Sequence, residues 1–262
     1  QLFTQQLCQQ DMRACRPSLT GYPVPFLVVF SIIHIVFAFF LLFLSKNYDE
    51  ITVRYDNLCH YGERCIIPFT VTKPLTQRLH VYYELGSFYQ NHFRFRGSIS
   101  YSQLYGKYLH ENGLSSCEPL ISTQTDGQNR TVLAPCGLRA YYLFTDLFTL
   151  PNIPSLEWDE TRISWKGEIN HLYKPLSNKY PNESYWMNNI SGFDGNVLNE
   201  KFIVWMRTAP TANFRKLVAR SDDPMPAGQY YLNVTTIQLT LIMERDQLFL
   251  LHYHGPVEIT DH

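Results

Sequence analysis

The chain has 262 residues, of which 45% are hydrophobic, 15% aromatic and 17% charged, and its formal net charge is −1. This length is enough for one large or two modest domains with a real core, and the apolar content excludes a disordered low-complexity chain. A near-neutral charge gives no electrostatic basis for a nucleic-acid partner, which requires a basic patch or stripe. The low charged fraction, with 18 Tyr and 17 Phe, favours a membrane or secreted protein.

The first predicted element is a transmembrane helix over Val24–Leu44, a run without formal charge. At 1.5 Å per residue such a run spans about 30 Å, the thickness of a bilayer's hydrocarbon core. A signal peptide is the alternative, but its apolar region is usually only about 7–15 residues long and ends at a small-residue cleavage site. His34 lies near the middle of the run. It either packs as a neutral side chain or forms a functional group within the membrane.

N-x-S/T sequons orient this helix, because the basic residues that flank it are balanced and the positive-inside rule gives no answer. A sequon accepts a glycan only on the lumenal side. All of the sequons follow the helix, at Asn129, Asn182, Asn189 and Asn233. We therefore predict a cytoplasmic N-terminal segment over 1–23, followed after the helix by a lumenal or extracellular ectodomain.

The six cysteines divide in the same way. Cys8 and Cys15 precede the helix on the reducing side and are interpreted as free thiols, with palmitoylation as the alternative. The others lie on the oxidising side, where four cysteines allow three pairings. Pairing nearest neighbours is the simplest choice, and a zinc site is disfavoured because no C-x2-C knuckle is present. This choice joins Cys59 to Cys65 and Cys117 to Cys136.

Beyond the helix the pattern is mostly strand-like, with β-branched and aromatic runs separated by Gly, Pro, Asn and Asp. Strands are predicted at Leu79–Tyr83, Phe202–Met206, Tyr230–Thr235 and Ile237–Met243. Helices are predicted over Tyr101–Glu111 and Asn213–Arg220, and a long glycosylated loop over Lys174–Asn199. The predicted fold class is therefore mostly β (all-β to α+β), an antiparallel-sheet ectodomain attached to an N-terminal transmembrane helix.

The sequence gives little support for a catalytic site, because it has no G-x-S-x-G elbow, P-loop or H-E-x-x-H motif. His252 and His254 are interpreted as exposed histidines rather than metal ligands. Glu157, Asp159 and Glu160 are interpreted as a solvated acidic turn rather than an acid–base pair. We predict no catalytic residue, no metal and no cofactor. A single-pass type II lumenal enzyme of glycosyltransferase type is the alternative, because its layout is the same, although no D-x-D metal motif occurs.

Several segments resemble one family, and they stand in the family's order. They are FTQQ (Phe3–Gln6), FYQNH (Phe88–His92), CEP (Cys117–Pro119), APCG (Ala134–Gly137), FIVWMRTA (Phe202–Ala209) with FRKL (Phe214–Leu217), and PAGQYYLNVT (Pro226–Thr235). Together they resemble the cell cycle control protein 50 family, also called the Lem3 or transmembrane protein 30 family. The similarity extends over about residues 3–235.

This resemblance implies a non-catalytic β-subunit of type-four P-type ATPases, the phospholipid flippases. Such subunits pair with the ATPase in the endoplasmic reticulum, permit its exit and support aminophospholipid translocation, which maintains membrane lipid asymmetry. The chain would then lie in the lipid bilayers of the endoplasmic reticulum, Golgi or endosomes and plasma membrane. No ATP or lipid chemistry would belong to it.

The resemblance also assigns residues. It implies that Cys117–Cys136 is the family's second ectodomain disulfide and that Asn233 is a glycosylated asparagine. The motifs FYQNH and FIVWMRTA are predicted to form the core of an ectodomain over 45–235. Loops of the partner are predicted to contact three arginines, Arg94, Arg96 and Arg207.

Three features depart from the family's pattern. Charges at 244–246 interrupt every apolar run near the end, so the family's second transmembrane helix is not found and 236–262 is predicted to be a divergent tail. Only Cys59 and Cys65 stand where the family usually has four cysteines. A W-W-T-D-like stretch is reduced to Trp165. A truncated, non-functional copy of the family is therefore a further alternative.

Overall fold

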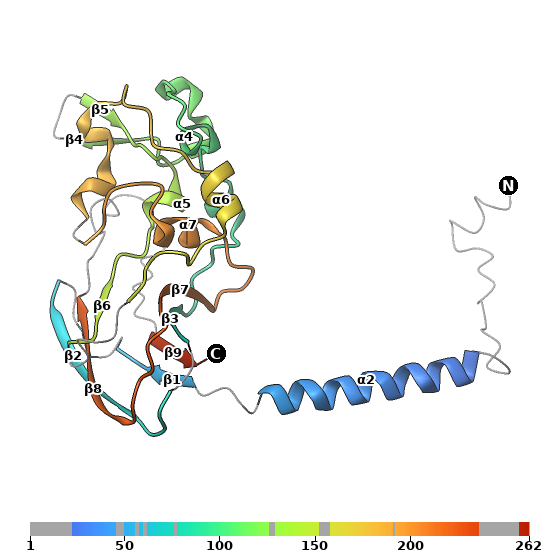
Figure 1. The fold of residues 1–262 in the computed structure, drawn as a ribbon. Coiled ribbons are helices and arrows are strands. Elements are labelled where there is room, and N and C mark those ends of the chain that lie inside the picture. Colours follow the sequence, from blue (N-terminus) through green and yellow to red (C-terminus); the bar gives the residue numbers. More distant parts are fainter. Residues whose placement is uncertain are drawn as a thin grey trace, which may run out of the picture. The chain divides into compact units, whose positions relative to one another are not determined.

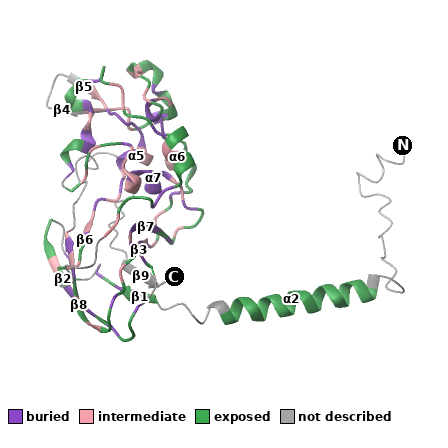
Figure 2. Ribbon diagram, in the orientation of Figure 1, coloured by how far each residue is buried: buried purple, intermediate pink, exposed green. Residues whose placement is uncertain are grey.

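The computed structural model describes residues 23–45, 50–55, 58–59, 62–75, 78–125, 129–151, 158–190, 192–235 and 257–261. The chain divides into two compact units, Gln1–Tyr48 and Asp49–His262. In the first unit, helix α2 spans Pro23–Ser45 (Figure 1). Proline suits the first turn of a helix, whose amides have no helical partner. Of the described residues, only Val24–Phe43 form a helix long and apolar enough to cross a membrane, and their side chains are exposed all round (Figure 2).

The second unit is built on antiparallel sheets. In sheet A the order is β1 (Glu50–Val53), β9 (Val257–Asp261), β3 (Leu79–Leu85) and β7 (Phe214–Ser221). In sheet B it is β2 (Arg64–Val71), β8 (Gly228–Thr235) and β6 (Leu147–Thr149). A hairpin joins β4 (Ser122–Thr125) and β5 (Asn129–Val132). All of these pairings are antiparallel. The predicted fold class is confirmed.

Short helices complete this unit. They are α3 (Phe93–Gly97), α4 (Tyr101–Leu104), α5 (Leu138–Tyr141), α6 (Lys166–His171) and α7 (Glu200–Met206), with 3₁₀ turns η1 (Glu111–Gly113), η2 (Ser115–Cys117), η3 (Asn182–Ser184) and η4 (Trp186–Asn189). Figure 1 shows α4 and the β4–β5 hairpin at one end of the second unit, β1, β2, β8 and β9 at the other, and α5, α6 and α7 between them.

The predicted strand Phe202–Met206 is wrong, because this segment is the helix α7. The side chain of Asn199 begins the helix by accepting a hydrogen bond from the Lys201 amide at 2.9 Å, as an N-cap residue does. All residues from Phe202 to Met206 are buried. A helix that is buried on every side has no amphipathic period, and a short apolar run then reads equally well as a strand.

The predicted helix Asn213–Arg220 is also wrong, because Phe214–Ser221 forms β7 and pairs with β3. Lys and Arg residues favour helix in this segment, but pairing with β3 decides its conformation. The predicted helix Tyr101–Glu111 is shortened to α4, since Gly106 has a φ of 77° beyond its end. The strands predicted at Leu79–Tyr83 and Tyr230–Thr235 are confirmed, whereas Ile237–Met243 lies outside the described residues.

The core lies around α7, as predicted for FIVWMRTA. The prediction for FYQNH holds only for Phe88 and Gln90, because its other three residues are exposed. Phe88 packs against Trp205, with ring centroids 5.7 Å apart, and against Phe95 and Phe214. Gln90 is fully buried, and its Oε1 accepts a hydrogen bond from the Ala209 amide at 2.9 Å. Phe88 and Gln90 of FYQNH therefore meet FIVWMRTA inside the second unit.

The segment predicted as a long loop contains only the turns η3 and η4 among its described residues, yet it packs on the core. Its buried side chains include Tyr180, Trp186, Met187 and Ile190. Trp186 donates through Nε1 to the Pro135 carbonyl at 2.8 Å. The loop is therefore a layer of the ectodomain and not a free excursion.

Two disulfides join nearest neighbours in the chain. One links Cys59 to Cys65, and the other links Cys117 to Cys136. The second is fully enclosed, with both cysteines at most 1% exposed. It fixes η2 against the segment before α5.

Gly137 gives a test of this packing. Its φ is 99°, and a Cβ on it would lie 2.3 Å from the Ser98 carbonyl oxygen. We expect Gly137→Ala to lower the free energy of unfolding by on the order of 3 kcal/mol, from backbone strain and overpacking. The matched control Gly97→Ala meets no atom within 4 Å and should change it by less than about 1 kcal/mol. Denaturant unfolding of the two variants in mild detergent measures both effects, and equal stabilities would contradict the tight contact.

Candidate functional site

The C-terminal end of α7 gathers cations from distant parts of the chain. The last carbonyls of a helix have no amide partner within it. Lys216 of β7 donates through Nζ to the Val204 carbonyl at 3.3 Å and also to the Arg207 carbonyl. Arg139 of α5 donates through Nη2 to the Met206 carbonyl. Cations in this position also favour the negative end of the helix dipole, so α5 and β7 together cap α7.

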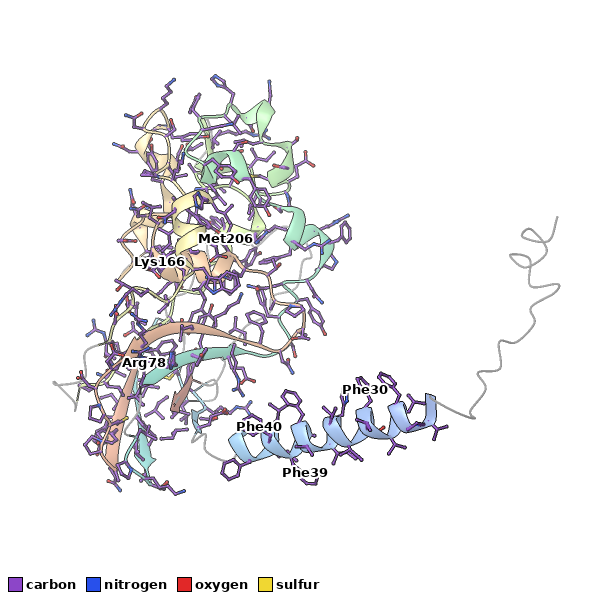
Figure 3. The ribbon with its side chains drawn as sticks, turned by 45° about the vertical axis from the view of Figure 1, so that its right-hand side comes forward. Phe30, Phe39, Phe40, Arg78, Lys166 and Met206 are labelled. Atoms are coloured by element: carbon purple, nitrogen blue, oxygen red, sulfur yellow. A yellow bond between two sulfur atoms is a disulfide. The ribbon has the colours of Figure 1, made fainter. Side chains whose placement is uncertain are left out.

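Arg207 connects this helix end to α6. Its Nε lies 3.0 and 2.9 Å from the two carboxylate oxygens of Glu168, and its Nη2 donates to the same carboxylate. The guanidinium carbon lies 5.2 Å from the centre of the Trp165 ring, a cation–π contact. Trp165 is nevertheless 73% exposed. Figure 3 labels Lys166, at the start of α6, and Met206, at the end of α7.

Further exposed aromatic and basic side chains stand on α3 and α4. Arg139 donates through Nη1 to the Tyr101 hydroxyl at 3.3 Å, and Tyr101 is 56% exposed. Helix α3 packs on α5, with Phe95 turned inward against Phe88 and with Phe93 69% exposed. We define the aromatic–cation surface as the exposed residues Phe93, Arg94, Arg96, Tyr101 and Trp165 together with the half-buried Arg139 and Arg207.

Burial and positive charge govern the electrostatics here. Burial first, and then the positive charges of Arg207 and Arg139, lower the pKa of Lys216 to about 8. Burial likewise raises the pKa of Tyr173 to about 12. Among the described groups in these contacts, Glu168 supplies the one carboxylate, and it is already bound to Arg207. The site therefore has an excess of positive charge beside open aromatic rings.

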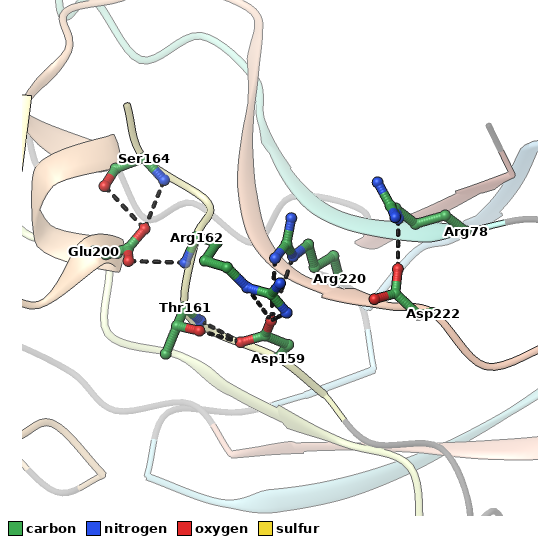
Figure 4. Close-up of polar contacts among 8 residues, drawn as sticks. All are labelled: Arg78, Asp159, Thr161, Arg162, Ser164, Glu200, Arg220 and Asp222. Atoms are coloured by element: carbon green, nitrogen blue, oxygen red, sulfur yellow. Dashed lines mark hydrogen bonds and ion pairs between the residues drawn. The ribbon is translucent and has the colours of Figure 1, made fainter. Parts of the chain in front are cut away.

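The acidic turn predicted around Asp159 holds a structural position (Figure 4). The backbone of Asp159 pairs with the backbone of Arg220 in β7 through hydrogen bonds of 2.8 and 3.0 Å. Its carboxylate accepts from Thr161 at 2.9 Å, from Arg162 at 2.6 Å and from Arg220 at 3.3 Å. These bonds, those from Thr161 and Arg162 first, hold the pKa of Asp159 well below its usual range. The turn is therefore ion-paired and not simply solvated.

The same segment is fixed to the start of α7. Glu200 accepts from the Arg162 amide at 2.8 Å and from the Ser164 amide at 2.7 Å. Nearby, Glu160 forms an ion pair with Lys201 at 2.7 Å. Glu157 lies outside the described residues. Because Trp165 follows Ser164 directly, this network also positions the exposed indole of the aromatic–cation surface.

The other predicted site residues are scattered. Asn182 and Asn189 lie exposed in η3 and η4, Asn233 is half-buried in β8, and Asn129 begins β5. Their glycosylation stays a prediction. Of the three arginines, Arg94 and Arg96 are exposed on α3, whereas Arg207 is bound to Glu168.

Of the histidines singled out in the sequence, His34 alone lies in the described part of the chain. His34 of α2 bonds through Nδ1 to the Phe30 carbonyl of its own helix at 2.8 Å. His252 and His254 lie outside the described residues. Within the described part of the chain, no group of three or more His, Cys, Asp or Glu side chains is placed to hold a metal ion.

Comparison with known proteins decides the family. Residues 41–238 match the LEM3 (ligand-effect modulator 3) family / CDC50 family. The chain belongs to this family. It is 35% identical to ALA-interacting subunit 3 of Arabidopsis thaliana, over 84% of this chain and 67% of that protein. It is 30% identical to cell cycle control protein 50A of Bos taurus, over 87% of this chain and 73% of that protein. The resemblance seen in the sequence motifs is confirmed.

Three members of the cluster at the end of α7 were not predicted from the sequence. Arg139 follows the APCG motif by two positions, Lys216 lies inside FRKL, and Glu168 follows Trp165 of the reduced W-W-T-D-like stretch by three positions. Each of these three residues lies in or beside a motif named in the sequence analysis, so the motifs indicated the right segments of the chain. Their separation along the chain hid the fact that all three reach the end of α7.

Lys216 gives a test based on pH. Its folded pKa of about 8 lies below the ordinary value of 10.5. Between these values the unfolded chain binds more protons, so stability rises with pH in this window. Relative to Lys216→Met, we expect the wild-type free energy of unfolding to increase by about 1 kcal/mol from pH 7 to pH 9. Equilibrium unfolding at both pH values measures the difference.

The control for this measurement is Lys166→Met, which removes an exposed lysine of α6. Its pH dependence should match the wild type. If Lys216→Met also showed the wild-type pH dependence, the lysine would titrate normally and would not be desolvated beneath α7.

Proposed function

We propose that this chain is the accessory, non-catalytic subunit of a type-four P-type ATPase that translocates phospholipids. The observation that carries the proposal is the CDC50 family match over residues 41–238. It is supported by relatives whose names describe them as ALA-interacting subunits. These names favour a subunit role over the alternative of a lumenal glycosyltransferase. ATP hydrolysis and the lipid path would then belong to the partner.

The subunit would be anchored by α2, with the N-terminal segment in the cytoplasm and the ectodomain in the lumen or outside the cell. The apolar length of α2 supports membrane anchoring. The two disulfides and the sequons support an oxidising, lumenal environment. Assembly in the endoplasmic reticulum, followed by transport to the Golgi, endosomes and plasma membrane, is the route expected for such a subunit.

The aromatic–cation surface is the contact site that we assign to the ATPase. Exposed Phe, Tyr and Trp side chains are the usual anchors of protein interfaces, and Arg is enriched beside them. Trp165 and Phe93 leave more than two thirds of their surface open. The positive charge of Arg94, Arg96 and Arg207 suits an acidic loop of the partner, because complementary charge favours association and register.

Co-purification tests this function. We expect the tagged full chain, co-expressed with candidate type-four P-type ATPases, to recover an ATPase in mild detergent and to carry glycans matured beyond the endoplasmic reticulum. Trp165→Ala, or Arg94→Glu with Arg96→Glu, should reduce the recovered ATPase by about tenfold or more, the range of interface hot spots. Arg64→Glu, an exposed charge reversal on β2 of sheet B, is the matched control and should leave recovery unchanged.

Two other outcomes are informative. Wild-type chain that binds no ATPase and keeps immature glycans would contradict the subunit role and would favour a non-functional family copy. If the wild-type chain recovers an ATPase and neither variant reduces that recovery, the subunit role stands, but the aromatic–cation surface is not the contact site. Thermal unfolding of each variant separates lost docking from lost folding.

A further inference from the structure

Arg139 carries a positive charge that pairs with no carboxylate in the described part of the chain. Its Nη1 donates to the Tyr101 hydroxyl at 3.3 Å and its Nη2 donates to the Met206 carbonyl, and both of these acceptors are neutral. Its Nε is buried and has no hydrogen-bond partner among the described residues. A partly buried cation without a counter-ion is costly. The protein itself therefore leaves this guanidinium without an anion.

Tyr173 brings an unused hydroxyl to the same region. The residue is only 9% exposed, and its ring packs edge-on against Phe202 of α7, with the ring centroids 6.3 Å apart. The next residue, Lys174, donates through its amide to the Leu104 carbonyl at the end of α4 at 2.8 Å. The Tyr173 ring is thus held in place, but its hydroxyl makes no hydrogen bond to the described part of the chain. A buried hydroxyl without a partner costs free energy.

The charges that act on Tyr173 show what surrounds its hydroxyl. Burial is the largest cause of its raised pKa, and the positive charge of Arg139, which lowers the pKa, is the next. Tyr101 also acts on it. Glu168 contributes as well, but its carboxylate is bound to Arg207. The hydroxyl of Tyr173 therefore lies near Arg139 and Tyr101, where the uncompensated charge is positive.

The groups gathered here suit an anion with two oxygens. The Tyr101 hydroxyl accepts a hydrogen bond from Arg139, so its own proton is available to a ligand, and Tyr101 is 56% exposed. The Tyr173 hydroxyl can donate in the same way. A carboxylate accepts several hydrogen bonds and pairs strongly with guanidinium groups. Two phenol donors beside an unpaired arginine therefore favour a carboxylate over a neutral or cationic ligand.

We propose that Tyr101, Arg139 and Tyr173 form a carboxylate-binding site, which receives one Asp or Glu side chain of the ATPase. Charge complementarity selects this occupant, because the site offers a cation and donors within the aromatic–cation surface. The bound carboxylate neutralises Arg139 and satisfies the Tyr173 hydroxyl. The assignment of the ligand to the ATPase rests on the proposed function, whereas the carboxylate site itself does not.

Acetate tests the site on the full chain without an ATPase. The unfolding equilibrium constant is measured in mild detergent, in sodium acetate and in sodium chloride of equal ionic strength. We expect about 0.1 M acetate to lower the wild-type unfolding constant about threefold relative to chloride, as a site with a dissociation constant of about 50 mM would. Tyr173→Phe removes only the hydroxyl and should abolish this difference. Tyr101→Phe is a second variant and should act in the same direction.

Recovery of the co-expressed ATPase tests the occupant. Tyr173→Phe should reduce the recovered ATPase about fivefold or more. It should not lower the free energy of unfolding, because the hydroxyl that it removes has no partner within the described chain. The matched control is Tyr180→Phe, which removes a hydroxyl bonded to the Leu109 amide at 2.9 Å. This control should lower stability and leave the recovery per folded chain unchanged, which is also what a merely structural role of Tyr173 would give.

Four outcomes would overturn parts of this inference. Equal effects of acetate on the wild type and on Tyr173→Phe would exclude the carboxylate site. Protection by inorganic phosphate but not by acetate would assign the site to a phosphate group instead. An acetate effect with unchanged ATPase recovery in Tyr173→Phe would exclude the ATPase as the source of the carboxylate. A wild-type chain that recovers no ATPase would contradict the proposed function and this occupant, and the acetate comparison would still decide the site.

Discussion

The fold of the second unit depends on how the carbonyl groups at the C-terminal end of α7 are hydrogen-bonded. This helix is buried on all sides, so water cannot pair with its final carbonyls, and an unpaired buried carbonyl is costly. Arg139 and Lys216 supply the donors. They come from α5 and from β7, on either side of α7 in the sequence. Capping one short helix therefore ties the sheets to the helical end of the ectodomain, and the position of Trp165 follows from it through Arg207.

This arrangement combines stability with recognition in one set of side chains. Arg207 accepts a hydrogen bond from Lys216 through its carbonyl, while its guanidinium binds Glu168 and faces the open ring of Trp165. The partner assigned to the aromatic–cation surface would thus contact groups that already hold the core. Its docking would stabilise the folded ectodomain by mass action, as any ligand specific for the native state does.

The sequence predicts what depends on local pattern and fails where tertiary contacts decide. The apolar length of α2 and the alternation of β3 and β8 were sufficient to identify them. The segments of α7 and β7 were assigned the other way round. In β7, Lys216 belongs to a charged run that resembles an exposed helix, yet it is 7% exposed beneath α7. Of the candidate site, Arg207 was recognised, but Arg139 and Glu168 reach it only through the fold.

The position of β9 in sheet A affects how the chain folds while it is being synthesised. It lies between β1 and β3, although it follows both by well over a hundred residues in the sequence. During synthesis β3 can pair with β7 before β9 emerges, whereas β1 has no neighbour in the sheet until β9 is made. The inner edges of β1 and β3 then remain open, and open edges are where strands pair with the wrong chain. Any chaperone that binds the nascent chain would need to protect those two edges until β9 is available.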